Sequence, residues 1–172
     1  MAVELQKLGS TININSSTDE ITFNVQCLRK NLDKTLVLLE ERMFNPKFTD
    51  DAFKRNQKQI LESFKQMKSQ PSTVASDVIA KINYGPNNIL GMSENGTEST
   101  VKNITLQDIQ DYYNNYITTK GMKVVIVGDV KQAEILPKLA FLDKLPNKKI
   151  DLPAVAATPL SNDQAKIYLV DI

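Results

Sequence analysis

The side chains that could do chemistry in this sequence are carboxylates, lysines and hydroxyls, because its 172 residues include no histidine. The missing imidazoles exclude histidine-based acid–base catalysis, nucleophiles activated by histidine, and histidine-ligated metal sites within the chain. The single cysteine, Cys27, excludes a disulfide within the chain and a metal site built from several thiolates. Cys27 lies on the apolar side of a predicted strand, which indicates a buried, inert thiol rather than a nucleophile.

Carboxylates occur in three pairs: Glu40 with Glu41, Asp50 with Asp51, and Asp108 with Asp111. Such pairs can act as acid and base in hydrolysis. The Asp50 pair lies in the first turn of a predicted helix, where the helix dipole favours negative charge, and the Glu40 pair borders a solvent-facing surface. The sequence therefore favours structural roles for these pairs, and we assign no catalytic, cofactor-binding or metal-binding residue.

Two further features are weaker signals. Gly128-Asp129 follows an apolar run, but the sequence lacks the glycine patterns of dinucleotide-binding and P-loop motifs, so a turn is favoured. Tyr112, Tyr113 and Tyr116 share the spacing of one helix face. The formal net charge of only +1 argues against a nucleic-acid-binding surface around them, and partial burial is expected.

The elements that position these residues begin with two strands, at 11–15 and 21–27, in which apolar and polar residues alternate. Their apolar residues would share one face, covered by helices: Ile12, Ile14, Ile21, Phe23, Val25 and Cys27. Helices are expected after Asn31, after Thr49, around 74–82, from Leu106 to Tyr116 and at 131–142. Residues 85–104 read as a long loop with at most one helical turn. The apolar run 122–129 predicts a strand buried on both faces.

The domain prediction divides the chain into three parts. Residues 1–143 would form one domain that lacks its N-terminal strand and helix, and residues 144–164 a proline-rich linker. Residues 165–172 would begin a strand, either the first of a following domain or a returning one. This organisation suggests a piece of a longer, multi-domain protein.

Several segments, taken in order, resemble a domain of the pitrilysin/insulinase family of zinc peptidases, the inverzincins. The similar segments are 8–13 (LGSTIN), 31–36 (NLDKTL), 45–48 (NPKF), 70–72 (QPS), 84–85 (YG), 96–98 (GTE), 104–109 (ITLQDI), 112–113 (YY) and 125–129 (VIVGD). The resemblance implies an α+β fold, a mostly antiparallel sheet with helices packed on one face. It also implies an active site built on H-x-x-E-H, with a further glutamate on a later helix as zinc ligand.

The H-x-x-E-H motif is absent from this chain, and the later helix departs from the family pattern. When that helix is aligned through residues 70–72, the position of the ligand glutamate falls on Ser63 rather than Glu62. At about 100° per residue, Ser63 borders the predicted apolar stripe, whereas Glu62 points nearly opposite to it. A serine hydroxyl is not among the usual zinc donors. No zinc is therefore expected in this chain, although a register in which Glu62 is the ligand stays open.

The leading hypothesis is a non-catalytic peptidase-like domain of a zinc metalloprotease. The resemblance implies that such a domain pairs with a catalytic domain, in the same longer chain or in a partner subunit, around a chamber that binds extended peptides. Zinc would then be bound in that catalytic domain. One alternative is a truncated catalytic domain whose H-x-x-E-H lies outside this chain, and a second is a non-enzymatic assembly subunit.

The sequence sets few limits on where the protein works. No run approaches the ~18 apolar residues of a membrane span, and the first residues lack the apolar stretch of a signal peptide. No nucleic-acid partner is expected. The compartment stays undetermined, with the periplasm or cell envelope open for a longer parent protein.

Overall fold

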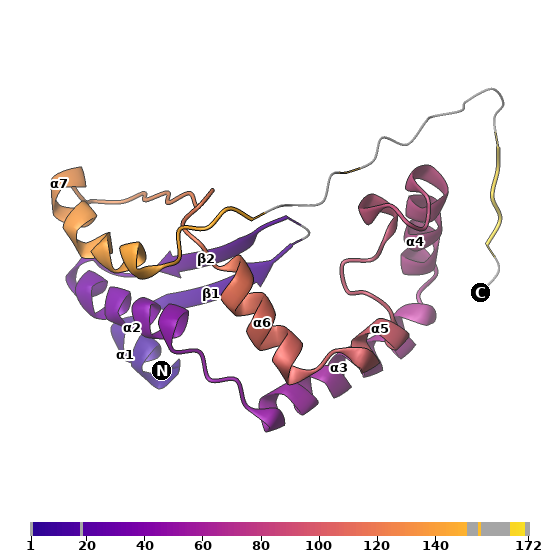
Figure 1. Cartoon of the computed structure of the whole chain (residues 1–172), viewed down its shortest axis with the longest axis horizontal. Coiled ribbons are helices and arrows are strands. Elements are labelled where there is room, and N and C mark those ends of the chain that lie inside the picture. Colours follow the sequence, from indigo (N-terminus) through magenta and orange to yellow (C-terminus); the bar gives the residue numbers. More distant parts are fainter. Residues whose placement is uncertain (1, 18, 151–154, 156–165, 171–172) are drawn as a thin grey trace. The chain divides into compact units, whose positions relative to one another are not determined.

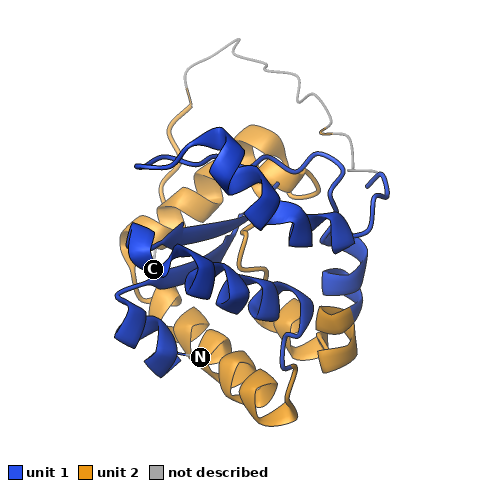
Figure 2. Cartoon of the chain, turned by 90° about the vertical axis from the view of Figure 1, so that its left-hand side faces the viewer, with its two compact units in different colours: residues 1–47, 111–150 blue, residues 48–110, 151–172 orange. Residues whose placement is uncertain are grey.

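The computed structural model of the chain describes residues 2–17, 19–150, 155 and 166–170. The chain divides into two compact units, which are coloured separately in Figure 2. Unit 1 comprises residues 1–47 and 111–150, and unit 2 comprises residues 48–110 and 151–172. The division falls within one helix, α6 (Leu106–Tyr116), between Gln110 and Asp111. Each unit has its own set of buried side chains.

Unit 1 is built on an antiparallel hairpin (Figure 1). Its elements are α1 (Ala2–Leu8), β1 (Thr11–Ser16), β2 (Ile21–Gln26), the 3₁₀ turn η1 (Arg29–Asn31), α2 (Leu32–Phe44), the C-terminal part of α6, α7 (Gln132–Ile135) and the 3₁₀ helix η3 (Leu136–Lys144). Ile12 pairs with Val25, and Ile14 pairs with Phe23. Because directly paired residues point to the same side of a sheet, this register confirms the predicted apolar face.

Helices cover one end of that apolar face. Ile12 is buried together with residues of α1, α2, α7 and η3, and Phe44 meets Phe141 edge to face, with ring centroids 6.5 Å apart. The Arg42 guanidinium donates a hydrogen bond of 2.6 Å to the Ile12 carbonyl and so ties α2 to β1. Ile14 and Val25, farther along the hairpin, stay exposed among the described residues.

A buried polar junction joins α1, β1 and α2. Gly9, at φ +59°, ends α1 in a Schellman motif, with the Ser10 amide bonded to the Leu5 carbonyl and the Gly9 amide to the Gln6 carbonyl. We call the set that follows the Ser10–Thr35 junction: the Asn31 amide donates to the Leu8 carbonyl at 2.7 Å, and the Thr35 hydroxyl donates to the Asn31 carbonyl at 2.8 Å. The hydroxyls of Ser10 and Thr35 lie 2.8 Å apart. Since the Thr35 hydroxyl donates to Asn31, it can accept from Ser10, whose hydroxyl also lies 3.4 Å from the Leu8 carbonyl.

Unit 2 is helical in its described part. It contains α3 (Asp50–Lys68), α4 (Pro71–Tyr84), the 3₁₀ turn η2 (Ile89–Gly91), α5 (Glu98–Asn103) and the first turns of α6. Phe64 of α3 and Val101 of α5 are buried, and the Gln57 side-chain amide donates to the carbonyls of Val101 and Ile104 at the end of α5. Gly91 packs against the end of α4, where a Cβ would lie 2.1 Å from the Gly85 carbonyl oxygen.

Two helix starts in unit 2 use capping boxes. The helix predicted from Leu106 begins with such a box: the Thr105 amide donates to the Asp108 carboxylate at 2.7 Å, and the Asp108 amide donates to the Thr105 hydroxyl at 3.2 Å. At α5, Thr97 and Thr100 form the same reciprocal pair. Helix α5 lies in the stretch 85–104, which the sequence predicted as a long loop; its Thr-x-x-Thr start lacks the Glu or Gln of the usual capping box.

The apolar run at 122–129 differs from its prediction. Residues 122–127 form no strand, and all of them are exposed. The physical reason is that no described strand lies hydrogen-bonded beside them. The helix predicted at 131–142 is confirmed by α7 and η3, and the change from α to 3₁₀ geometry falls beside Pro137, at the start of η3.

The C-terminal stretch is described only in part. Residues 145–150 belong to unit 1, where the Thr118 hydroxyl bonds to the carbonyls of Pro146 and Lys148, at 2.6 and 2.9 Å. Most of the predicted linker, at 151–154 and 156–164, lies outside the described residues. Residues 166–170 are exposed and form no ladder with the described strands, so the predicted strand there stays a prediction.

Removing the Ser10–Thr35 junction should destabilise unit 1. Thr35→Val keeps the side-chain volume but leaves the buried Ser10 hydroxyl with only the Leu8 carbonyl, at 3.4 Å, as acceptor. This should cost about 1–3 kcal/mol of unfolding free energy, whereas Ser10→Ala should cost about 1 kcal/mol. Because the two side chains are directly coupled, the double variant should lose less than the sum. Urea denaturation measures all four proteins, and strictly additive losses would contradict the coupling.

The α6 capping box should titrate at low pH. Hydrogen bonds from the Thr105 hydroxyl and amide lower the pKa of Asp108. A lowered folded-state pKa means that the stabilisation is complete above the unfolded value, about 4, and is lost as pH falls through the folded value. The amide proton shift of Thr105, followed by NMR, should therefore titrate with a midpoint below that of an ordinary aspartate and stay flat in Asp108→Asn. A midpoint at or above the ordinary value would contradict this assignment.

Candidate functional site

Helix α3 carries the two positions at which the family pattern places a zinc ligand. Its start is set by Thr49, whose hydroxyl accepts a hydrogen bond from the Ala52 amide at 3.4 Å. Asp50 and Asp51 lie in its first turn and Lys65 and Lys68 in its last, so that both ends complement the helix dipole. The helix confirms the predicted start after Thr49.

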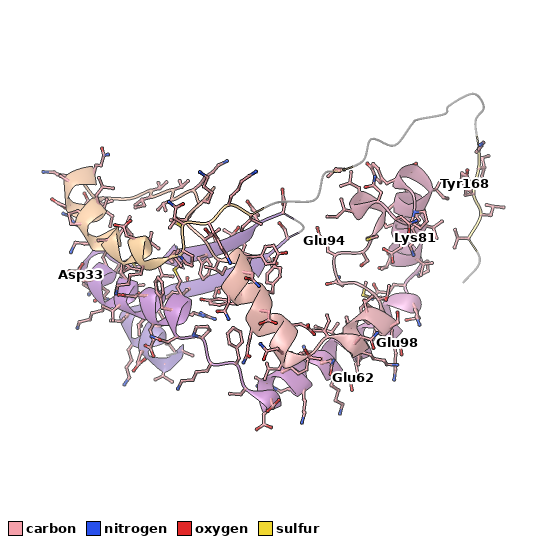
Figure 3. All side chains as sticks on the ribbon, viewed as in Figure 1. Asp33, Glu62, Lys81, Glu94, Glu98 and Tyr168 are labelled. Atoms are coloured by element: carbon pink, nitrogen blue, oxygen red, sulfur yellow. The ribbon has the colours of Figure 1, made fainter. Side chains whose placement is uncertain are left out.

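Consecutive side chains of α3 face different surroundings. Phe64 is buried, whereas the Glu62 side chain is 59% exposed (Figure 3). The Glu62 carboxylate forms an ion pair of 3.9 Å with Lys58, one turn earlier. This arrangement matches the sequence-based assignment of Glu62 to the face opposite the apolar stripe.

Ser63 is half-buried between these two faces. Its hydroxyl donates a hydrogen bond of 2.7 Å to the carbonyl of Ile60, within the same helix. Back-bonding of this kind is common for serine inside a helix and satisfies the only proton of the hydroxyl. The hydrogen bond of Ser63 and the ion pair of Glu62 are thus both made within α3 itself.

The residues present do not fit a zinc site. Zinc in proteins is held by thiolate, imidazole and carboxylate groups, and a catalytic site needs three of them. Within the described residues, no three cysteine, aspartate or glutamate side chains come together to hold a metal ion, and the whole sequence contains no histidine.

Other candidate residues are engaged in structural contacts. The Asp129 carboxylate accepts a hydrogen bond of 2.7 Å from Arg29, which raises the pKa of that guanidinium, and Gly128-Asp129 makes a turn. Glu40 pairs with Lys144 at 2.5 Å. Cys27 is half-buried and follows the end of β2, where the sequence analysis expected a buried position within the strand.

The tyrosine cluster divides between two roles. Tyr112 and Tyr116 stack with ring centroids 4.6 Å apart, and both stay partly exposed. The Tyr113 hydroxyl donates to the Met43 carbonyl in unit 1, and burial raises the pKa of its phenol. The predicted partial burial therefore applies to Tyr113 alone, because Tyr112 and Tyr116 are exposed.

A charge cluster that the sequence analysis missed lies in unit 2. Glu98 of α5 pairs with Lys102 at 2.8 Å and with Lys68 at 3.5 Å, and these ammonium groups lower the pKa of its carboxyl (Figure 3). The cluster borders a cavity of about 520 Å³ that is also lined by Phe64 and Met67. The spacing of four residues between Glu98 and Lys102 could have indicated their ion pair. The pair of Glu98 with Lys68 spans 30 positions, so no local pattern could have indicated it.

Comparison with known proteins places this fold in a family. The family model described as Insulinase (Peptidase family M16) matches residues 1–93, more than half of the chain. The chain belongs to the insulinase family of peptidases, family M16. A second model of the family, described as Peptidase M16 inactive domain, matches residues 103–171.

Relatives of this M16 chain include proteins with peptidase names. It is 26% identical over 94% of its length to the probable mitochondrial-processing peptidase subunit beta of Arabidopsis thaliana, of which it covers 30%. It is 22% identical over 78% of its length to the uncharacterized zinc protease YmxG of Bacillus subtilis, of which it covers 33%. The M16 chain thus spans about a third of the curated relatives it matches.

A solved structure confirms the fold. The peptidase M16 inactive domain from Pseudomonas fluorescens matches with a TM-score of 0.76 at 23% identity, over 89% of this M16 chain and 39% of that one. No helix in the described ranges is both long enough and apolar enough to cross a membrane.

Substitutions at three consecutive α3 positions should report which face each residue occupies. Glu62→Gln removes an exposed ion pair, worth about 0.3–0.5 kcal/mol, and Ser63→Ala should change stability by less than about 1 kcal/mol. Phe64→Ala, by contrast, should cost about 3–5 kcal/mol because it empties a buried site. Chemical denaturation measures all three, and a loss above about 1 kcal/mol in Glu62→Gln would contradict its exposed position.

Proposed function

We propose that this chain is a non-catalytic M16 peptidase-like domain that completes the fold and the peptide-binding chamber of a zinc metalloprotease. The catalytic domain, in the same longer chain or in a partner subunit, would bind the zinc and carry out hydrolysis. The chain's match to the inactive-domain model supports this proposal.

The observation that carries the proposal is the state of the ligand positions on α3. Ser63 has a hydroxyl bonded to its own helix, and the carboxylate of Glu62 is exposed and paired with Lys58. A carboxylate in this state would have to leave its ammonium partner and change helix face to reach a metal on the buried side. Without histidine, the chain also offers no imidazole to share the ion.

One alternative is supported by a specific finding. The match of residues 1–93 to the insulinase model is also what a catalytic domain would give if its H-x-x-E-H lay outside this chain. In that case Glu62 would be the third zinc ligand, and its side chain would be indispensable for hydrolysis. The two proposals therefore differ in whether the side chain of Glu62 is needed for hydrolysis.

The test uses the protein expressed from its complete gene. Hydrolysis of a fluorogenic peptide is measured with and without a zinc chelator, for the wild type, Glu62→Gln and the matched control Lys58→Gln, which removes the same ion pair from the other side. We expect chelator-sensitive hydrolysis that both variants leave within about twofold, because an exposed pair contributes little.

Two results would overturn the proposal. A loss of hydrolysis of about 100-fold or more in Glu62→Gln, with Lys58→Gln unchanged, would identify Glu62 as a ligand and the chain as part of a catalytic domain. A wild-type protein without hydrolysis would contradict a role in a working protease and favour a non-enzymatic assembly subunit.

A further inference from the structure

The cavity of about 520 Å³ in unit 2 is lined by residues of α3, α4 and α5 and of the loop that leads into α5. Phe64 and Met67 of α3 and Val74 of α4 supply its apolar lining. All of its lining residues belong to unit 2, and its volume lies in the range of pockets that hold small ligands. The space can therefore take a small molecule with an apolar body.

The α4 side of the cavity carries a carboxylate without a partner. Asp77 lines the cavity and is half-buried. Within the part of the chain that the structure describes, no hydrogen bond or ion pair engages the Asp77 side chain, and Lys81, one helical turn later, is exposed and forms no ion pair with it. Because a half-buried carboxylate is stabilised by a cation that bonds to it, this position favours a ligand with a positively charged group.

Positive charge predominates on the side of the cavity formed by α3 and α5. The Glu98 carboxylate lies between the ammonium groups of Lys68 and Lys102, at 3.5 and 2.8 Å (Figure 3). All three residues line the cavity, so this side holds two positive charges and one negative charge. Since an ammonium group has three N–H donors, each lysine keeps donors that Glu98 does not use. These donors favour a carboxylate on the ligand.

Ligands with a single charge fit this cavity less well. A ligand that is only cationic would satisfy Asp77 but would meet the surplus positive charge of the two lysines. A ligand that is only anionic would satisfy the lysines but would meet the carboxylate of Asp77. Because like charges placed together select against a ligand, both kinds are disfavoured. A zwitterion can direct one charge toward each side while its apolar body contacts Phe64 and Met67.

We propose that this cavity binds a small apolar zwitterion, either a free amino acid or a dipeptide. The ammonium group of the ligand contacts Asp77, its carboxylate contacts Lys68 and Lys102, and its apolar side chains contact Phe64. This binding requires neither zinc nor hydrolysis, so it can hold or fail independently of the function proposed above.

The test measures ligand binding to the full 172-residue chain by isothermal titration calorimetry. The probes are L-phenylalanine and the dipeptide leucyl-phenylalanine, and the one that binds more tightly shows which size of ligand the cavity takes. We expect a dissociation constant below about 1 mM for that ligand. Acetylation of its amino group or amidation of its carboxyl group removes one charge, and each change should weaken binding about tenfold or more, because each removes charge-assisted hydrogen bonds.

Variants of the charged lining residues should match these ligand modifications. Asp77→Asn should weaken binding of the unmodified ligand about tenfold or more but leave the affinity for the acetylated ligand unchanged, because that ligand has no ammonium group to lose. Lys102→Gln should likewise weaken binding of the unmodified ligand but not of the amidated one. The matched control is Lys81→Gln, at an exposed α4 position outside the lining, which should leave binding unchanged.

Four results would overturn the proposal. The first is that neither probe binds with a dissociation constant below about 1 mM. The second is equal affinity for the unmodified and the amidated ligand, which would identify a site for cations alone. The third is an equal loss of affinity for the acetylated and the unmodified ligand in Asp77→Asn, which would show that Asp77 acts through the structure rather than by contact. The fourth is a loss in Lys81→Gln as large as that in Asp77→Asn.

Discussion

Unit 1 depends on the requirement that every hydroxyl buried at the Ser10–Thr35 junction has a partner. Thr35 is fully buried, and its hydroxyl donates to the Asn31 carbonyl at the start of α2 and lies 2.8 Å from the Ser10 hydroxyl, just after Gly9 ends α1. Leaving one of these groups unpaired would cost about 1–3 kcal/mol, so the junction fixes the position of α2 relative to β1. The apolar cluster around Ile12 then packs against a helix whose position is already set.

The sequence predicted elements where local chemistry decides the structure. Thr49 and Thr105 mark helix starts through their own hydroxyls, and Pro137 changes helix geometry because it lacks an amide proton. The sequence could not predict contacts between distant positions, such as Ser10 with Thr35 or Lys68 with Glu98, because no local pattern encodes them. The exposure of 122–127 was missed for the same reason, since burial of a strand depends on which neighbours are present.

The candidate site could be assessed from sequence because it depends on helical geometry rather than on distant contacts. The spacing along α3 places Glu62 opposite the apolar stripe, and its exposed ion pair with Lys58 agrees with that placement. The hydrogen bond from Ser63 to Ile60 could not be foreseen, because several rotamers of a helical serine are allowed. The fold of the M16 family is thus retained in a chain whose donor set does not fit zinc, consistent with the general separation of fold from chemistry.

Measuring the zinc content of the chain tests most directly the claim that its own residues do not hold a zinc ion. The 172-residue chain is equilibrated with excess zinc, separated from free metal by gel filtration, and analysed for metal and protein. Our account predicts far less than one zinc per chain, with no difference between the wild type and Glu62→Gln. One tightly held zinc per chain that disappears in Glu62→Gln would contradict it.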